Sequence, residues 1–159
     1  MRSACCAALI VAACAATMGP WRAVSHAEPS APPVEERRES PFTANVDREY
    51  DRGVQARLAK QWAAAVEAFQ AAVTLRPNFP EAWNELGYAL RNQGRYPESL
   101  AAYEEALRQR PDFPEALEYL GEAYVKMGRL DEARRVLLRL RPLDSARAEE
   151  LDEAIKRER

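Results

Sequence analysis

Cysteine and histidine are almost absent from this sequence of 159 residues, which holds three cysteines and one histidine. All four lie near the N-terminus, as Cys5, Cys6, Cys14 and His26. If residues 1–27 are removed from the mature protein, neither residue type is left. Such a chain has no Cys or His nucleophile, no Ser-His-Asp triad, no zinc site built from Cys or His, and no disulfide bond.

Runs of basic residues are also missing, and the net charge of the whole chain is −2. Domains that bind nucleic acid usually carry a surplus of Lys and Arg that pairs with phosphates. We therefore expect no nucleic-acid partner. The hydrophobic content of 47% and the charged content of 30% are typical of a soluble domain with a sizeable core.

Groups suited to catalysis are scarce beyond the first 27 residues. The serines there are Ser30, Ser40, Ser99 and Ser145, and most carboxylates lie close to arginines, as solvated helical pairs do. Neighbouring glutamates such as Glu104-Glu105 point to different sides of a helix and cannot act as an acid/base pair. We expect no enzyme activity, no catalytic residues, no cofactor, no metal and no small-molecule substrate.

The first 27 residues have the pattern of a secretory signal peptide. Arg2 supplies the positive charge, Ala4 to Met18 an apolar run, and Ser25-His26-Ala27 a cleavage site. The run is shorter than the roughly 20 apolar residues that span a bilayer. Cleavage after Ala27 would leave a mature chain with a net charge of −4.

Two alternatives for this leader stay open. It could remain uncleaved as an N-terminal anchor. Alternatively, Val11-Ala12-Ala13-Cys14 resembles a bacterial lipobox, and lipidation of Cys14 would tether the protein to a membrane.

Residues 28–43, EPSAPPVEERRESPFT, are rich in Pro and Glu and predict a disordered linker. The folded domain is predicted at 44–159, in a periplasmic or secreted bacterial protein.

A period of 34 residues runs through this domain. Glycines and prolines mark it most clearly, because both are uncommon in this chain. The matching residues are Gly53, Gly87 and Gly121; Gly94 and Gly128; Pro77 and Pro111; and Pro80 and Pro114.

Each period predicts two helices joined by a turn. In the middle copy, Gly94 can end the first helix with a positive φ. The first helix has a continuous apolar stripe, in which Gly87 forms a notch for its partner helix; the stripe is Trp83, Leu86, Gly87 and Leu90. At the boundaries between copies, Asn78 with Glu81 and Asp112 with Glu115 have the spacing of capping boxes.

The unit resembles the tetratricopeptide repeat, whose pattern is W-x2-L-G-x2-Y, then A-x3-F, then P. Trp83, Leu86, Gly87, Ala106 and Pro111 match it, with Leu90, Ser99 and Tyr103 as mild departures. The resemblance implies an all-α fold, an α-solenoid of three helix-turn-helix repeats and a C-terminal capping helix. The repeats are 46–79, 80–113 and 114–147, and the capping helix is 144–159, with Asp144 or Ser145 at its start and an apolar stripe of Ala148, Leu151 and Ile155.

The resemblance also implies a concave groove lined by the first helix of each repeat. The residues that we expect to face a partner there are Tyr50, Arg57, Asn84, Tyr88, Arg91, Glu118 and Glu122. For Tyr50 and Tyr88, packing between neighbouring first helices is an equal alternative. The acidic row of Asp47, Glu81 and Glu115 is explained by helix dipoles and capping. We assign Trp62, Trp83, Phe69 and Tyr103 to the core.

The function implied is that of a non-enzymatic interaction or scaffold module that binds an extended or helical protein segment. A segment with Arg or Lys would suit Glu118 and Glu122. A clamp for the C-terminal carboxylate of chaperone tails is disfavoured, because its positions hold Tyr50, Val54, Glu85, Glu115 and Tyr119. The alternative is a lipid-anchored protein that assembles an envelope complex through its convex face or by self-association. Incorporation of labelled fatty acid that depends on Cys14 would favour it.

Deletion of residues 144–159 should lower the melting temperature by several degrees, because the last repeat would lose the helix that covers its apolar side. Thermal unfolding followed by circular dichroism measures the change. An unchanged melting temperature would mean that this segment does not dock.

Overall fold

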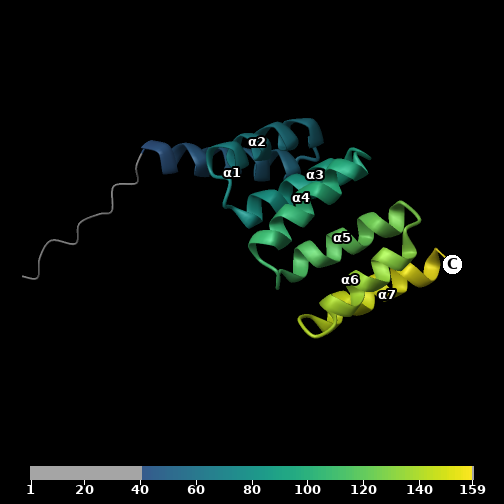
Figure 1. Cartoon of the computed structure of the whole chain (residues 1–159). Helices are drawn as coiled ribbons and strands as arrows, with labels where there is room; N and C mark the ends of the chain where they lie inside the picture. Colours follow the sequence, from purple (N-terminus) through teal and green to yellow (C-terminus); the bar gives the residue numbers. More distant parts are fainter. Residues whose placement is uncertain (1–40, 159) are drawn as a thin grey trace, which may run out of the picture. The chain divides into compact units, whose positions relative to one another are not determined.

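The computed structural model describes residues 41–158, and all of its regular structure within this range is helical (Figure 1). The predicted signal peptide and linker residues 28–40 lie outside the described range. The first helix begins at Pro41, three residues before the start predicted for the domain. The seven helices are α1 (Pro41–Leu58), α2 (Trp62–Leu75), α3 (Pro80–Asn92), α4 (Tyr96–Gln109), α5 (Pro114–Lys126), α6 (Leu130–Leu140) and α7 (Ser145–Arg157).

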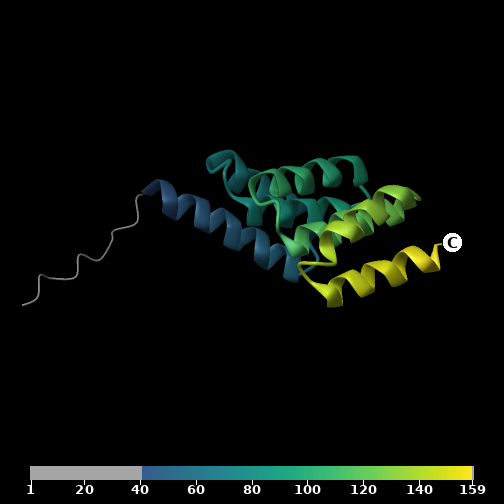
Figure 2. The ribbon, with the colours of Figure 1, turned by 60° about the horizontal axis from the view of Figure 1, so that its bottom comes forward.

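The helices pack as three hairpins followed by a single helix, and they form one compact unit. Each hairpin, α1/α2, α3/α4 and α5/α6, packs on the next one along the chain (Figures 1 and 2). The backbones of α1, α3, α5 and α7 also approach one another in sequence order, whereas those of α2, α4 and α6 do not. We call the side formed by α1, α3, α5 and α7 the first-helix face and the side formed by α2, α4 and α6 the second-helix face. The predicted all-α array of three repeats with a capping helix is confirmed.

The same turn joins the two helices of every repeat. The N–H of Gly94 donates to the carbonyl of Arg91 at 2.9 Å, and the N–H of Arg95 donates to that of Leu90 at 3.0 Å. Gly94 has a φ of +76°, as predicted, and Gly128 has +72°. The first repeat makes the same turn with Lys60, whose φ is +56°. A left-handed backbone is rare for lysine because its Cβ crowds the following carbonyl.

The predicted glycine notch brings the two helices of a repeat together. A Cβ built on Gly87 would lie 2.7 Å from ring carbons of Tyr103 on α4, and one on Gly53 would lie 2.6 Å from Phe69 on α2. In the third repeat the side chain that packs into the notch comes from α7, since a Cβ on Gly121 would clash with a methyl of Leu151. The capping helix therefore takes part in the packing that defines the repeat.

The predicted capping boxes are wrong. Phe79 and Phe113, not Asn78 and Asp112, are the N-cap residues of α3 and α5, and neither helix start has a side-chain cap. The ring of Phe79 is covered by the guanidinium of Arg76 at 4.1 Å, and Arg110 covers Phe113 at 4.4 Å. Proline at the first helical position has a suitable φ and no N–H, so fewer N–H groups at the starts of α3 and α5 need a hydrogen-bond partner.

At α7 the predicted cap is present, because the Asp144 carboxylate accepts a hydrogen bond from the N–H of Arg147 at 3.1 Å. The predicted apolar stripe of α7 is buried, with Ala148, Leu151 and Ile155 all at most 3% exposed. No helix between residues 41 and 158 is both long and apolar enough to cross a bilayer.

Two of the four aromatic residues assigned to the core are fully buried. Phe69 and Tyr103 have no exposed surface, whereas Trp62 and Trp83 are half-buried. Trp83 packs on the edge of the core and donates its indole N–H to the carbonyl of Pro77 at 2.8 Å. Trp62 is the first residue of α2 and lies against Tyr88, outside the core clusters, so its assignment to the core is wrong.

Replacing Lys60 by glycine should stabilise the protein. The left-handed conformation costs a non-glycine residue about 1–2 kcal/mol, and glycine loses about 0.5–1 kcal/mol more conformational entropy on folding. We expect the free energy of unfolding to rise by up to about 1 kcal/mol, measured by urea denaturation. The matched control is Gly94→Lys, which places lysine in the same turn of the next repeat and should lower it. A loss of stability in Lys60→Gly would contradict this account of the turn.

Candidate functional site

Three aromatic rings meet in the middle of the first-helix face. The ring centroid of Tyr88 on α3 lies 6.0 Å from that of Trp62 at the start of α2 and 5.1 Å from that of Tyr119 on α5. All three side chains are half-buried. Tyr119 also lies 6.1 Å from the buried ring of Tyr103, so the group is fixed to the core beneath it. We call Trp62, Tyr88 and Tyr119 the aromatic cluster.

Two arginines cover the rings of this cluster. The guanidinium of Arg91 lies 5.2 Å from the ring centroids of both Tyr88 and Tyr119, and that of Arg57 lies 5.9 Å from Tyr88. Such cation–π contacts are each worth about 0.5–1 kcal/mol at exposed sites. The arginines come from the same position of successive repeats and thereby connect α1, α3 and α5.

Each of these arginines also pairs with a carboxylate on the next first helix. Arg57 Nε lies 2.9 Å from Glu85 Oε2, and Arg91 donates a hydrogen bond to Glu122. Burial raises the pKa of Glu85, and the charge of Arg57 opposes that rise. Arg57 and Arg91, which we expected to face a partner, therefore lie on this face, but their charges are already paired within the chain and hold the rings in place.

Of the seven residues predicted to face a partner, four belong to this connected group: Arg57, Tyr88, Arg91 and Glu122. Tyr50 lies apart from them and packs on Phe79 at 4.9 Å and on Phe69 at 5.7 Å. For Tyr50, packing between helices is thus the role that the structure displays.

Asn84 and Glu118, which we also expected to face a partner, are buried. Asn84 is 4% exposed and Glu118 is 6% exposed. Glu118 accepts a hydrogen bond from Arg147 of α7, which occupies the place that we had given to a partner's cation. Burial raises the pKa of Glu118, and the hydrogen bond from Arg147 opposes the rise. A capping helix that supplies its own arginine is not visible in the repeat pattern.

The acidic row of Asp47, Glu81 and Glu115 is also paired within the chain. Glu81 and Glu115 lie in the first turns of α3 and α5, but Asp47 lies beyond the first turn of α1, so the explanation by a helix dipole is wrong for Asp47. Asp47 lies 2.7 Å from Arg76, and Glu81 pairs with Arg110, in each case at the end of the same repeat. The equivalent position of the third repeat holds Asp144, and Arg147 of α7 replaces the missing cation at 3.2 Å from Glu115. These carboxylates stabilise the repeats and are not free to meet a partner.

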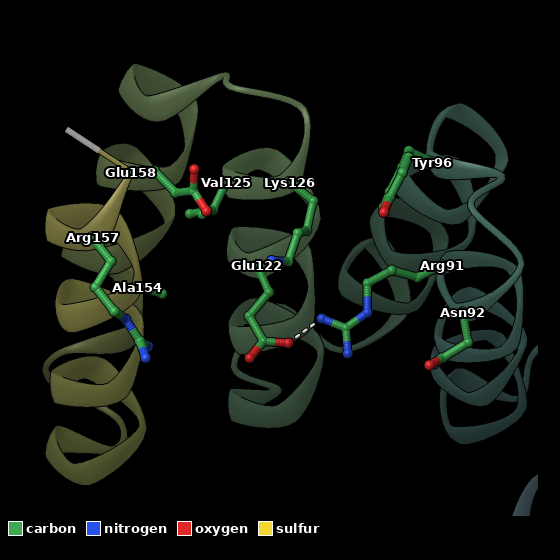
Figure 3. Close-up of a pocket in the computed structure, with 9 residues that line it drawn as sticks. All are labelled: Arg91, Asn92, Tyr96, Glu122, Val125, Lys126, Ala154, Arg157 and Glu158. Carbon is green, nitrogen blue, oxygen red and sulfur yellow. Dashed lines mark hydrogen bonds and ion pairs between the residues drawn. The ribbon is translucent and has the colours of Figure 1, made fainter.

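A pocket of about 490 Å³ lies at one end of the first-helix face (Figure 3). It is lined by the C-terminal ends of α3, α5 and α7 together with Tyr96 at the start of α4. The ion pair of Arg91 and Glu122 connects α3 and α5 there, and Lys126 and Arg157 add two cations. The pocket is polar and mixed in charge.

A second cavity, of about 620 Å³, lies between α5 and α7 on the same face. Its charged lining is mostly acidic, with Glu122, Glu149, Glu150 and Glu153 against the single cation of Arg157. Among the described residues no three His, Cys, Asp or Glu side chains are placed to hold a metal ion. The face thus has aromatic rings in edge and tilted contact in its middle and carboxylates toward α7, and both can bind a partner.

Sequence reasoning missed three members of the group: Trp62, Glu85 and Tyr119. Glu85 and Tyr119 are equivalent positions of successive repeats, each one residue after a predicted contact position. The sequence would have indicated both residues if the predicted contact face of each first helix had included the residue that follows each contact position. Trp62 had no such signal, because it comes from a second helix and reaches the first-helix face only through the hairpin turn.

Comparisons with known proteins agree with this fold. A model described as TPR repeat matches residues 57–94 and 87–128. A search of the curated proteins finds no match. The TPR2B domain of yeast Sti1, solved as a pHsp70 complex, has a TM-score of 0.70 and 18% identity, over 73% of this chain and 99% of that one.

Two further structures are similar over comparable lengths. The TPR domain of Arabidopsis OM64 has a TM-score of 0.69 and 16% identity, over 73% of this chain and 98% of that one. The Yersinia enterocolitica type III secretion chaperone SycD, solved with a peptide of the translocator YopD, has a TM-score of 0.66 and 20% identity, over 71% and 93%. At these identities the likeness concerns the fold. Together with the match over residues 57–128, it shows that this part of the chain is built from repeats of the tetratricopeptide (TPR) kind.

Proposed function

We propose that the protein is a non-enzymatic interaction module that binds a protein or peptide segment on its first-helix face. The observation that carries the proposal is the aromatic cluster, three half-buried rings fixed by Arg57 and Arg91 in the middle of that face. Tyrosine and tryptophan give a large contact area at a low entropic cost and are enriched at interfaces. The similar TPR domains solved with peptides support this class of partner.

The segment bound on the first-helix face needs chemical groups different from those of a chaperone tail. A pair of terminal carboxylates needs cations or amides, and the positions of such a clamp hold Glu85, Glu115 and Tyr119 among others. Glu85 and Glu115 are paired with Arg57 and Arg147 and offer an acidic chain end neither a cation nor an amide. The acidic cavity between α5 and α7 instead favours a segment that places an apolar or aromatic side chain on Tyr88 and an Arg or Lys toward Glu149 and Glu150.

We also propose that the protein acts outside the cytoplasm. The support is the leader of Arg2, the apolar run of Ala4 to Met18 and the cleavage pattern at Ala27. In the alternative form, lipidation at Cys14 would hold the TPR domain at a membrane through the Pro-rich linker. Both forms place the same first-helix face in the same compartment.

Replacing Tyr88 by alanine should abolish most binding on the first-helix face. Peptides selected from a displayed library of random short sequences on the wild-type protein serve as probes, and their affinities are measured by fluorescence anisotropy. Loss of a central ring typically costs at least about 2 kcal/mol of binding free energy, so we expect a loss of about 30-fold. The matched control, Tyr88→Phe, keeps the ring and should bind nearly as well as the wild type.

Circular dichroism at the temperature of the measurement confirms that both variants are helical. If the selected peptides bind Tyr88→Ala as tightly as the wild type, the aromatic cluster is not the binding site. If Tyr88→Phe loses as much as Tyr88→Ala, the tyrosine hydroxyl, rather than the ring, makes the contact, which contradicts the stacking that we propose.

A fusion of residues 1–43 to alkaline phosphatase should be active in a Gram-negative host. This reporter needs disulfide bonds and therefore gains activity only when it is exported. Leu9→Arg, which interrupts the apolar run, should abolish the activity. An inactive wild-type fusion would contradict export. Incorporation of labelled fatty acid that is lost in Cys14→Ala would establish the lipid-anchored form, and its absence would leave the cleaved form and the uncleaved anchor, which differ in mass.

A further inference from the structure

A cleft on the second-helix face carries a concentration of arginines. It has a volume of about 490 Å³ and lies between α4 and α6, with α5 as its floor. Four arginines and two glutamates line it, a net charge of +2; the arginines are Arg108, Arg129, Arg135 and Arg139. We call this the arginine cleft. It is formed by helices that do not contribute to the aromatic cluster, apart from α5.

Two of these arginines are left without a close carboxylate. Arg108 pairs with Glu105 at 2.6 Å and Arg129 pairs with Glu132 at 2.8 Å. Arg135, whose side chain is 71% exposed, approaches Glu132 only to 3.9 Å. Arg139 donates to the carbonyl of Pro111 at 3.4 Å, and among the described residues it has no carboxylate within 4 Å. Arg135 and Arg139 lie one turn apart on the same side of α6.

The repeat provides an internal comparison for this cleft. The equivalent cleft between α2 and α4, of about 500 Å³, is lined by Arg95, Glu98 and Glu105, a net charge of −1. Shifted by one repeat, Arg135 and Arg139 correspond to Ala101 and Glu105. The positive charge of the arginine cleft is therefore particular to the third repeat and is not a requirement of the fold.

The floor of the arginine cleft is apolar. It is formed by Leu107, Leu120, Tyr124 and Val136, none of which is more than 9% exposed. The guanidinium of Arg129 lies 4.7 Å from the ring of Tyr124 and covers one end of this floor. A ligand in the cleft would meet a hydrophobic floor and a positively charged rim.

We propose that the arginine cleft binds an acidic protein segment that also carries apolar side chains. Asp or Glu side chains of the segment pair with Arg135 and Arg139, which can each form bidentate hydrogen bonds with a carboxylate. Apolar side chains of the segment cover the floor. A chain fits better than a membrane, because α4 and α6 form walls that keep a flat surface away from Leu120 and Tyr124. This second surface lets one molecule hold two partners at once.

The probe is a fluorescein-labelled peptide of alternating Glu and Leu, titrated with the full chain and followed by anisotropy. The variant Arg135→Ala/Arg139→Glu carries the residues of the preceding repeat and should bind at least about tenfold more weakly. The charge-matched control, Arg134→Ala/Arg141→Glu, changes arginines outside the cleft lining and should retain the affinity within about threefold. Tyr88→Ala should bind the probe like the wild type, which separates this proposal from the first-helix face.

Several results would overturn the proposal. Equal weakening by the cleft variant and the control would show a general charge effect. Equal binding of a peptide of alternating Lys and Leu to Tyr88→Ala, in which the first-helix face is disabled, would show that the contact in the cleft is only hydrophobic. Binding to phosphatidylglycerol vesicles but not to the peptide would assign the cleft to a membrane. Self-association in light scattering that is lost in Arg135→Ala/Arg139→Glu would assign it to a second copy of this chain.

Discussion

The close approach of a first-helix glycine to a bulky side chain from a neighbouring helix is the contact on which the rest of this structure depends. Gly53 admits Phe69, Gly87 admits Tyr103, and Gly121 admits Leu151 of α7. Each contact lets two helices pack closely: α1 with α2, α3 with α4, and α5 with α7. With the apolar stripes directed inward, the remaining positions of each helix are presented on two separate faces. Function in this chain is therefore a matter of what those remaining positions hold.

Ion pairs between equivalent positions reinforce this arrangement. Asp47 with Arg76 and Glu81 with Arg110 connect the beginning of a repeat to its end, while Arg57 with Glu85 and Arg91 with Glu122 connect one repeat to the next. The more exposed pairs, Asp47 with Arg76 and Glu81 with Arg110, contribute little stability individually, about 0–1 kcal/mol. The pairs between repeats have a further effect, because they hold the guanidinium groups of Arg57 and Arg91 against Tyr88 and so order the aromatic cluster before a partner arrives. Ordering in advance lowers the entropy lost on binding.

The sequence alone was enough to predict the fold, because the 34-residue period, the notch at Gly87 and the turn at Gly94 can all be seen in the spacing of residues along the chain. The same spacing predicted the site less well, because the site depends on contacts between different helices. Arg147 pairs with Glu118 from a helix outside the repeats, and Trp62 reaches Tyr88 from the preceding repeat; neither contact follows from the spacing of residues along one helix. The predicted capping boxes do not form, because proline is the first helical residue and Asn78 and Asp112 therefore lie one residue before the N-cap position. Their glutamates, Glu81 and Glu115, pair with arginines instead.

A repeat protein offers a control that most folds lack, since each position can be compared with its equivalents in the same molecule. Where all copies agree, as at Gly53, Gly87 and Gly121, the residue serves the packing. Where one repeat has a different residue at a position that the core packing does not require, the difference needs another cause. Position 88 holds tyrosine between Val54 and Glu122, and position 139 holds arginine where the preceding repeat has Glu105. Both are departures from the repeat, one on the first-helix face and one on the second-helix face, and for this reason we propose that the middle and third repeats recognise partners. The first repeat, whose turn retains Lys60 in a left-handed conformation, supports that site through the contacts of Arg57 and Trp62 with Tyr88 and the pair of Arg57 with Glu85.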